Sequence, residues 1–237
     1  MATLVLVHGA WGGAHGFRHV RRLLRQAGHE VSTPCLTGIG ERVHLASPLV
    51  NLSTHVRDVV HHILYEDLEQ ITLVGFSYGG MVVTGALEHV AERVRHLVFL
   101  DAFVPDDGDC VAGLVRGDAR QKIRLGEDWL LQGPLREYDS PEEARWMGLR
   151  RTPQPGACFT EAVHLAQPLE SFAFTRTYVK ATRSPPQDPG EAAFRRAAQR
   201  ARQSPAWRYV EIDSNHMLSS NRPQALADLL AQIAEAA

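Results

Sequence analysis

Short, continuously apolar runs alternate along this chain with longer segments that have helical periodicity. The first run, residues 3–7, is rich in β-branched side chains, which is typical of a strand buried on both faces of a parallel sheet. Residues 17–26 then place apolar side chains at helical spacing, and Gly28 predicts the end of that helix. A second strand is predicted at 29–34. The chain therefore opens β-α-β, which indicates parallel strands joined by right-handed crossovers.

The same alternation continues to the end of the chain with one interruption. Further strands are expected at residues 71–74, 95–100, 175–182 and 207–212. Further helices are expected from Ser53, as the N-cap, and over residues 81–90, 191–203 and 225–236. Between residues 105 and 174 short helical pieces alternate with Gly- and Pro-containing turns, and no run has strand character. We therefore predict an α/β core formed by residues 1–104 and 175–237, with a helical cap, 105–174, inserted after the fourth strand.

Composition narrows the possible classes of protein. The 237 residues include 44% hydrophobic residues and carry a formal net charge of -2. Nucleic-acid binders usually show a basic excess, so no nucleic-acid partner is expected. No stretch approaches the roughly 20 apolar residues of a membrane helix, and the N-terminus does not resemble a signal peptide. The three widely spaced cysteines do not suggest a disulfide framework or a zinc site, so we expect a cytoplasmic protein that does not bind a membrane.

The clearest chemical signal is Gly75-Phe76-Ser77-Tyr78-Gly79, which matches the G-x-S-x-G nucleophile elbow. Its context fits, because a predicted strand precedes it and a predicted helix follows. Such a turn holds the serine in a strained backbone conformation, where neighbouring side chains at positions 75 and 79 would collide with backbone. Ser77 is therefore the candidate nucleophile, and the start of the helix favours the negative charge that develops there.

A serine hydroxyl needs a base to remove its proton. In this arrangement the base lies in the loop after the last strand, where the sequence has His216, the only histidine after residue 164. His216 is therefore the candidate base. His8 follows the first strand and is expected to order the adjoining loop.

The acid that orients His216 has two candidates. The usual place for it is the loop after the strand that ends near Thr182, where Asp188 is the first carboxylate. The alternative is Asp101, at the carboxyl end of the fourth strand. The pattern does not separate Asp188 from Asp101, nor does it exclude that His216 has no strong acid partner.

The oxyanion of a tetrahedral intermediate needs two N–H donors. We expect one from Tyr78, the residue after the nucleophile, and one from Ala10, in the loop after the first strand. Trp11 and Phe76 are expected in the substrate pocket. The cap adds further candidates for the pocket lining, or equally for a small core of its own: Trp129, Trp146, Phe159 and Phe172.

Taken together, these motifs resemble one family of the α/β-hydrolase fold. It contains plant methyl-salicylate esterases, plant hydroxynitrile lyases and bacterial esterases, including pyrethroid hydrolases. The resemblance rests on Val7-His8-Gly9-Ala10, Gly75-x-Ser77-Tyr78-Gly79-Gly80-Met81, Leu100-Asp101-Ala102-Phe103-Val104-Pro105 and His216-Met217, and residues 36–45 are similar to the bacterial branch. The chain departs from the family pattern at Phe76, where His is usual, at Arg183-Ser184, where the acid is usual, and around His216.

The resemblance implies Ser77 and His216 as members of a catalytic triad, an oxyanion hole at Ala10 and Tyr78, an apolar pocket under the cap, and no metal or organic cofactor. The leading hypothesis is hydrolysis of a small to medium apolar or aromatic carboxylic ester through an acyl-enzyme. A lyase or cyclase of secondary metabolism, with His216 as general acid and base, is the alternative. A ligand-binding protein without activity is a third. The expected partner is a small-molecule substrate, and the protein is expected to be a monomer or homodimer.

Overall fold

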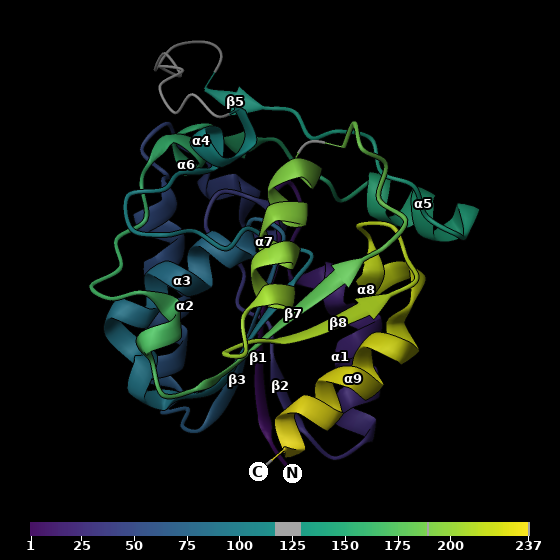
Figure 1. Ribbon diagram of the computed structural model, residues 1–237. Coiled ribbons are helices and arrows are strands. Elements are labelled where there is room, and N and C mark those ends of the chain that lie inside the picture. The colour runs from purple at the N-terminus through teal and green to yellow at the C-terminus, as the bar shows by residue number, and fades with distance from the viewer. Residues whose placement is uncertain (117–128, 189, 237) are drawn as a thin grey trace.

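The chain forms a six-stranded parallel sheet in a computed structural model that describes residues 1–116, 129–188 and 190–236. The strand order is β2-β1-β3-β4-β7-β8 (Figure 1). The strands are β1 Thr3–Val7, β2 Glu30–Ser32, β3 Ile71–Phe76, β4 Val94–Leu100, β7 Thr175–Ala181 and β8 Arg208–Ile212. The predicted α/β-hydrolase fold is confirmed, and the parallel register brings the carboxyl ends of β1, β3 and β4 to one edge.

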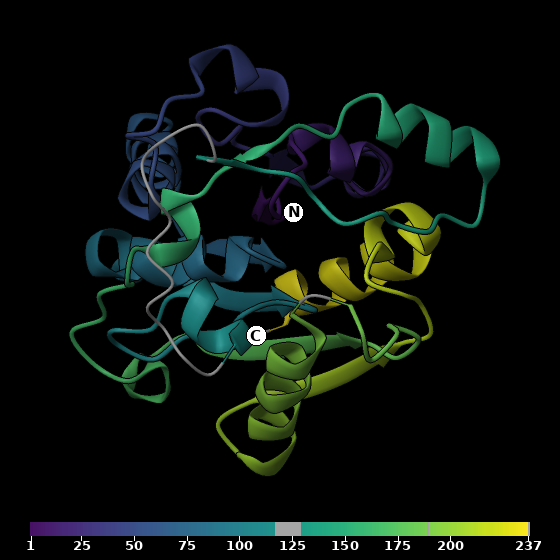
Figure 2. The ribbon, with the colours of Figure 1, turned by 90° about the horizontal axis from the view of Figure 1, so that it is seen from above.

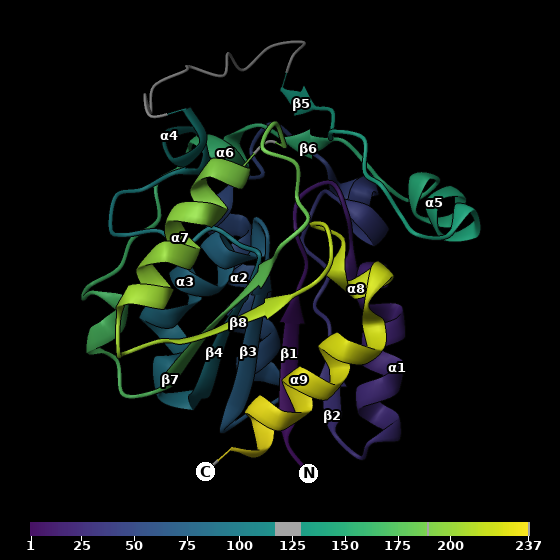
Figure 3. The same cartoon turned by 45° about the vertical axis from the view of Figure 1, so that its right-hand side comes forward.

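Helices cover both faces of the sheet (Figure 3). Leu4 and Leu6 of β1 face α1 and α9, whereas Val5 and Val7 face α2, α3 and α7. Because side chains on both faces of the sheet are buried, the strands are apolar at consecutive positions. The helices are α1 Arg18–Gln26, α2 Leu52–Tyr65, α3 Gly79–Val90, α7 Glu191–Gln203, α8 Leu218–Asn221 and α9 Pro223–Glu235. Short 3-10 helices occupy Ala14–Phe17, Gly40–Leu45, Ala91–Arg93 and Leu169–Ser171.

Most of the described part of the segment between β4 and β7 lies above the carboxyl ends of the strands (Figures 1 and 3). Its described helices are α4 Val111–Arg116, α5 Pro141–Gly148 and α6 Ala157–Thr160. Seen from above, α5 lies beside α1 and α8 (Figure 2), and Arg18 of α1 forms an ion pair with Glu143 of α5. The boundaries at 105 and 174 stay a prediction.

Two features of the sequence prediction need correction. The segment above the sheet contains two short strands, β5 Leu130–Leu131 and β6 Gln154–Pro155, which pair antiparallel. Two residues are too few to produce a strand pattern. The N-cap of α2 is Asn51, not Ser53, because the Asn51 side chain accepts the N–H of Thr54 at 3.0 Å in a capping box.

In the described part of the chain, no helix is both long enough and apolar enough to cross a membrane.

Candidate active site

Ser77 lies on a tight turn between β3 and α3. Its φ of 55° is in the left-handed region, which non-glycine residues rarely adopt. Its N–H donates to Leu100 O at 3.2 Å, which ties the turn to the end of β4. A Cβ at Gly79 would lie 2.6 Å from Val7 O, so the motif needs its glycine where the turn meets β1. The elbow therefore follows from backbone crowding, as the motif predicted.

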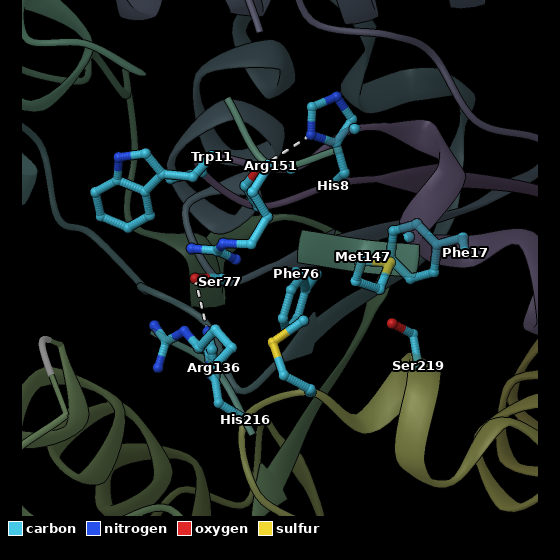
Figure 4. A pocket seen from close by; sticks show the side chains of 16 residues that line it. His8, Trp11, Phe17, Phe76, Ser77, Arg136, Met147, Arg151, His216 and Ser219 are labelled. Atoms are coloured by element: carbon cyan, nitrogen blue, oxygen red, sulfur yellow. Dashed lines mark hydrogen bonds between the residues drawn. The ribbon is translucent and has the colours of Figure 1, made fainter. Parts of the chain in front are cut away.

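His216 lies in the loop between β8 and α8, and its Nε2 is 3.0 Å from Ser77 Oγ (Figure 4). Two aromatic rings pack against its imidazole. The ring of Phe76 is 4.8 Å away and that of Phe194 5.1 Å away, the latter stacked at 8°. Phe76, which stands where the resembled family usually has His, thus packs against the candidate base, and Phe194 was not foreseen from the sequence.

The carboxylate next to His216 belongs to Asp101. Its Oδ2 lies 2.7 Å from His216 Nδ1, and the residue is completely buried. Asp101 follows β4 with a φ of 41°, and its N–H donates to Val179 O at 2.7 Å, which aims the side chain toward the β8 loop. Asp188 instead forms an ion pair with Arg136 at 3.1 Å. Of the two candidate acids, the structure brings Asp101 to the histidine and not Asp188.

Asp101 also belongs to a buried ionic network that sequence reasoning missed. Lys180 Nζ donates to Asp101 Oδ1 at 2.7 Å and to Glu191 Oε2 at 3.1 Å. All three residues are buried, and Asp101 Oδ1 also accepts the Ala181 N–H at 3.3 Å. A lysine inside a strand buried on both faces was the available signal, because such a charge requires a partner.

These contacts set the protonation states of Asp101 and His216. Burial alone would raise the pKa of Asp101, but the hydrogen bond and charge of His216 and the ammonium of Lys180 outweigh it and lower the pKa below its ordinary value. Burial lowers the pKa of His216, and the Asp101 carboxylate only partly opposes this. At neutral pH, Asp101 is therefore ionised and His216 is neutral, so Nε2 can accept a proton from Ser77.

A pocket opens over Ser77 and His216 (Figure 4). Trp11 and Phe76 line it, as expected, together with Phe17, Met147, Met217 and Ser219. Two basic residues that the sequence did not single out, Arg136 and Arg151, also line it. Its remaining described lining consists of His8, Gly9, Ala10, Gly12, Gly13 and Gly16.

The four aromatic residues expected from the cap do not line this pocket. Phe172 stacks on Phe174, with ring centroids 5.2 Å apart. The Trp146 ring is covered by the guanidinium groups of Arg18 and Arg150, at 3.6 and 3.9 Å from its centroid. Phe159 is 7% exposed and packs in the core against Tyr78. Trp129 is half-buried and accepts a backbone hydrogen bond from Gly156. Periodicity could not tell a pocket wall from a core position.

Comparison with known sequences places this arrangement in a family. A profile described as "Alpha/beta hydrolase family" matches residues 4–229. The chain belongs to this family. It is 35% identical to a carbendazim hydrolyzing esterase from Nocardioides sp. (strain SG-4G) over 98% of this chain and 100% of that protein.

Two further likenesses agree with this assignment. The hydrolase is 32% identical to salicylic acid-binding protein 2 from Nicotiana tabacum, over 59% of this chain and 53% of that protein. An extracellular alpha/beta-hydrolase from a Paenibacillus species has the same fold, with a TM-score of 0.84 and 24% identity over 100% of both chains. The resemblance that the motifs indicated is therefore confirmed.

In this hydrolase the loop after β1 contains Ala10, which is expected to be one of the two N–H donors to an oxyanion. Ala10 lines the pocket, and Tyr78 begins the turn into α3 while its hydroxyl lies 3.0 Å from His55 Nδ1 in the core. Among the described residues, the N–H groups of Ala10 and Tyr78 have no hydrogen-bond partner. Both are thus available to a ligand, and the role of each in an oxyanion hole stays a prediction.

His8 and Glu41 hold that loop in place. The N–H of Leu36 donates to His8 Nε2 at 3.1 Å, so Nδ1–H donates to Gly9 O at 2.9 Å. Burial lowers the pKa of His8 to about 4 and keeps it neutral. The Glu41 carboxylate lies 2.8 Å from His15 Nδ1 and accepts the His15 N–H at 2.7 Å. Burial opposes its ionisation, but these hydrogen bonds lower the pKa of Glu41 to about 2.

Proposed function

We propose that this hydrolase cleaves a carboxylic ester through an acyl-enzyme formed on Ser77. The observation that carries the proposal is the continuous chain from Ser77 Oγ to His216 Nε2, at 3.0 Å, and from His216 Nδ1 to Asp101, at 2.7 Å. A serine, an imidazole and a buried carboxylate in this order form the machinery of acyl transfer. The similarity to a relative named as a hydrolyzing esterase supports the same reaction.

The reaction begins when Ser77 Oγ attacks the ester carbonyl and His216 Nε2 accepts its proton. Asp101 holds the Nδ1–H and stabilises the imidazolium that forms. The N–H groups of Ala10 and Tyr78 donate to the oxyanion, and each such donor contributes roughly 3 kcal/mol. His216 then returns the proton to the leaving alcohol. Water, deprotonated by His216, attacks the acyl-enzyme and releases the acid, which restores Ser77.

The pocket supports an ester with an apolar or aromatic part. Phe17, Phe76, Met147 and Met217 give it an apolar wall beside the triad. A weak acid partner for His216 would favour the alternative hypothesis of a lyase or cyclase. The buried Asp101 at 2.7 Å is a strong one and favours hydrolysis. A cytoplasmic location and a monomeric or dimeric state stay predictions from the sequence.

The test uses 4-nitrophenyl butyrate together with a fluorophosphonate probe. We expect the purified protein to hydrolyse the ester and to gain the probe's mass at Ser77, and Ser77→Ala to lose both. Ser219→Ala is the matched control, because this hydroxyl lines the same pocket but has no hydrogen bond to His216. Full turnover by Ser77→Ala, or probe attached elsewhere, would contradict the proposal.

A further inference from the structure

Two guanidinium groups reach from the segment above the sheet into the pocket that holds Ser77. Arg136 and Arg151 both line it, and Figure 4 shows the Arg151 guanidinium close to Ser77 and the Arg136 side chain beside His216. Neither residue has a part in the acyl-transfer steps described above. In the described ranges 1–116, 129–188 and 190–236, no aspartate or glutamate lines this pocket.

The two arginines differ in how their charge is compensated. Arg136 forms its ion pair with Asp188, and only 8% of its side chain is exposed. Asp188 lies outside the Ser77 pocket, in the wall of a neighbouring hollow that Arg136 and His216 share. Arg151 donates to Pro134 O at 3.1 Å, and no carboxylate within the described part of the chain forms an ion pair with it. The pocket therefore carries one positive charge that no described residue balances.

The Arg151 guanidinium is held in place by its surroundings. A Cβ at Gly133 would lie 2.6 Å from Arg151 Nη2 and 2.7 Å from Trp11 Cγ. Because Gly133 has no side chain, the guanidinium of Arg151 and the indole of Trp11 can occupy this space. Burial lowers the pKa of both arginines, and the charge of Arg151 adds to this effect on Arg136. Two like charges at one half-buried pocket repel each other and are poorly solvated. A bound anion relieves both effects, so its binding is stabilised.

We propose that Arg151, with Arg136, binds a free carboxylate of the substrate, so that the substrate is an ester carrying a second, ionised carboxyl group. This inference rests on the proposed ester hydrolysis and specifies its substrate class. A carboxylate fits better than a phosphate dianion because only one positive charge is uncompensated. A guanidinium also matches the planar carboxylate with two parallel hydrogen bonds. The apolar wall then contacts the rest of the substrate.

The test compares matched pairs of esters with and without the charge. Mono-4-nitrophenyl glutarate and 4-nitrophenyl 5-methylhexanoate differ in the acyl part, where an isopropyl group replaces the carboxylate. The pair of 3-acetoxybenzoate and its methyl ester places the charge on the alcohol side. We expect the acidic member of at least one pair to have the higher kcat/KM. Arg151→Gln should lower that value about 10- to 100-fold and change the neutral member little.

Arg150→Gln is the matched control, because Arg150 is the adjacent arginine but its guanidinium lies over Trp146, away from the pocket. It should leave both members unchanged. The neutral ester also reports whether Arg151→Gln folds. If Arg151→Gln lowers kcat/KM equally for the charged and the neutral esters, Arg151 has a structural role and the inference is overturned. The absence of any preference for a charged ester would overturn it too, while Ser77-dependent hydrolysis of the neutral esters would leave the proposed function standing.

Binding can be measured without turnover. Calorimetric titration of 3-acetoxybenzoate into Ser77→Ala should show binding that Ser77→Ala/Arg151→Gln loses. This binding measurement tests the carboxylate site separately from the proposed ester hydrolysis, because binding can be observed even if the wild-type protein hydrolyses no ester. Inhibition of the wild-type protein by inorganic phosphate at much lower concentrations than by acetate would overturn the assignment to a carboxylate.

Discussion

Individual residues at this site are held in backbone conformations that they adopt at a cost. In the described part of the chain, positive φ values among non-glycine residues include 59° at Trp11, 55° at Ser77 and 41° at Asp101. Each costs of order 1–3 kcal/mol and persists only where surrounding contacts demand it. All three residues follow strands that end at the same edge of the sheet. These strained turns thus place the hydroxyl of Ser77 and the carboxylate of Asp101 on the two ring nitrogens of His216, while the indole of Trp11 donates to Leu131 O.

At this scale the choice between the two candidate acids can be tested. We expect Asp101→Asn to lower kcat for a neutral ester by about 10⁴, because an amide does not stabilise the imidazolium and favours the wrong tautomer of His216. Asp188→Asn should retain most of the activity, since its carboxylate contacts Arg136. Steady-state kinetics of both variants at neutral pH makes the comparison. A large loss in Asp188→Asn with none in Asp101→Asn would reverse the assignment.

The elements differ in how far the sequence could predict them. The strands predicted from residues 71, 95 and 175 and the elbow at Ser77 could be recognised in the sequence, because a buried parallel strand needs a continuous apolar run and the tight turn needs its glycines. His216 was found from chain order alone. Asp101 could not be chosen over Asp188, because the choice depends on how the ends of β4, β7 and β8 lie relative to one another. Local patterns carry no such information.

The loop after β1 shows the same limit. Nothing in the local sequence pairs Glu41 with residues 14 and 15, yet its carboxylate accepts the N–H groups of Ala14 at 3.2 Å and His15 at 2.7 Å. Contacts between segments this far apart arise only when β1 and its following loop are packed. Arg136 and Arg151 were likewise missed, because the segment that carries them has little periodicity from which to predict where side chains point.

Substitution of Glu41 tests whether its carboxylate holds the loop that carries Ala10. Glu41→Gln should lower kcat of a neutral ester about 10-fold, because weaker hydrogen bonds let the loop with Ala10 move away from the oxyanion position. Amide hydrogen exchange at Ala14 and His15 should become faster. Glu30→Gln, at an exposed position in β2, is the control. Faster exchange without any change in kcat would show that Glu41 serves stability alone.

Across the whole molecule, buried ionisable groups link the site to the stability of the fold. Lys180 joins Asp101 of the β4 end to Glu191 of α7, so the proposed acid is part of the contact between the sheet and that helix. His8 and His55 are buried as well, and burial lowers the pKa of each to about 4. Both form hydrogen bonds that tie the loop at residues 36–37 to the core. Protonating either histidine would disrupt that packing.

These histidines predict how the whole fold responds to acid. Above pH 6.5 they are neutral in both the folded and the unfolded chain, so their contribution to stability is complete. As pH falls from about 6.5 towards 4, the unfolded chain binds protons that the folded chain does not, and the free energy of unfolding declines. The loss is on the order of 2–3 kcal/mol for each histidine. Urea unfolding between pH 7 and 4.5 measures it.

A comparison within one helix isolates the effect. His55 and His61 both belong to α2, but His55 is completely buried and His61 is exposed. His55→Gln removes one proton uptake on unfolding, so its stability should fall less steeply with decreasing pH than that of the wild type, even though its stability at pH 7 is lower. His61→Gln should keep the wild-type slope. If His55→Gln and the wild type show the same slope, the acid sensitivity must come from other groups, and His8, whose pKa is also lowered to about 4, would be the next to test. The carboxylates of Asp101 and Glu41 could not account for it, because their lowered pKa values place their loss of stability at more acidic pH.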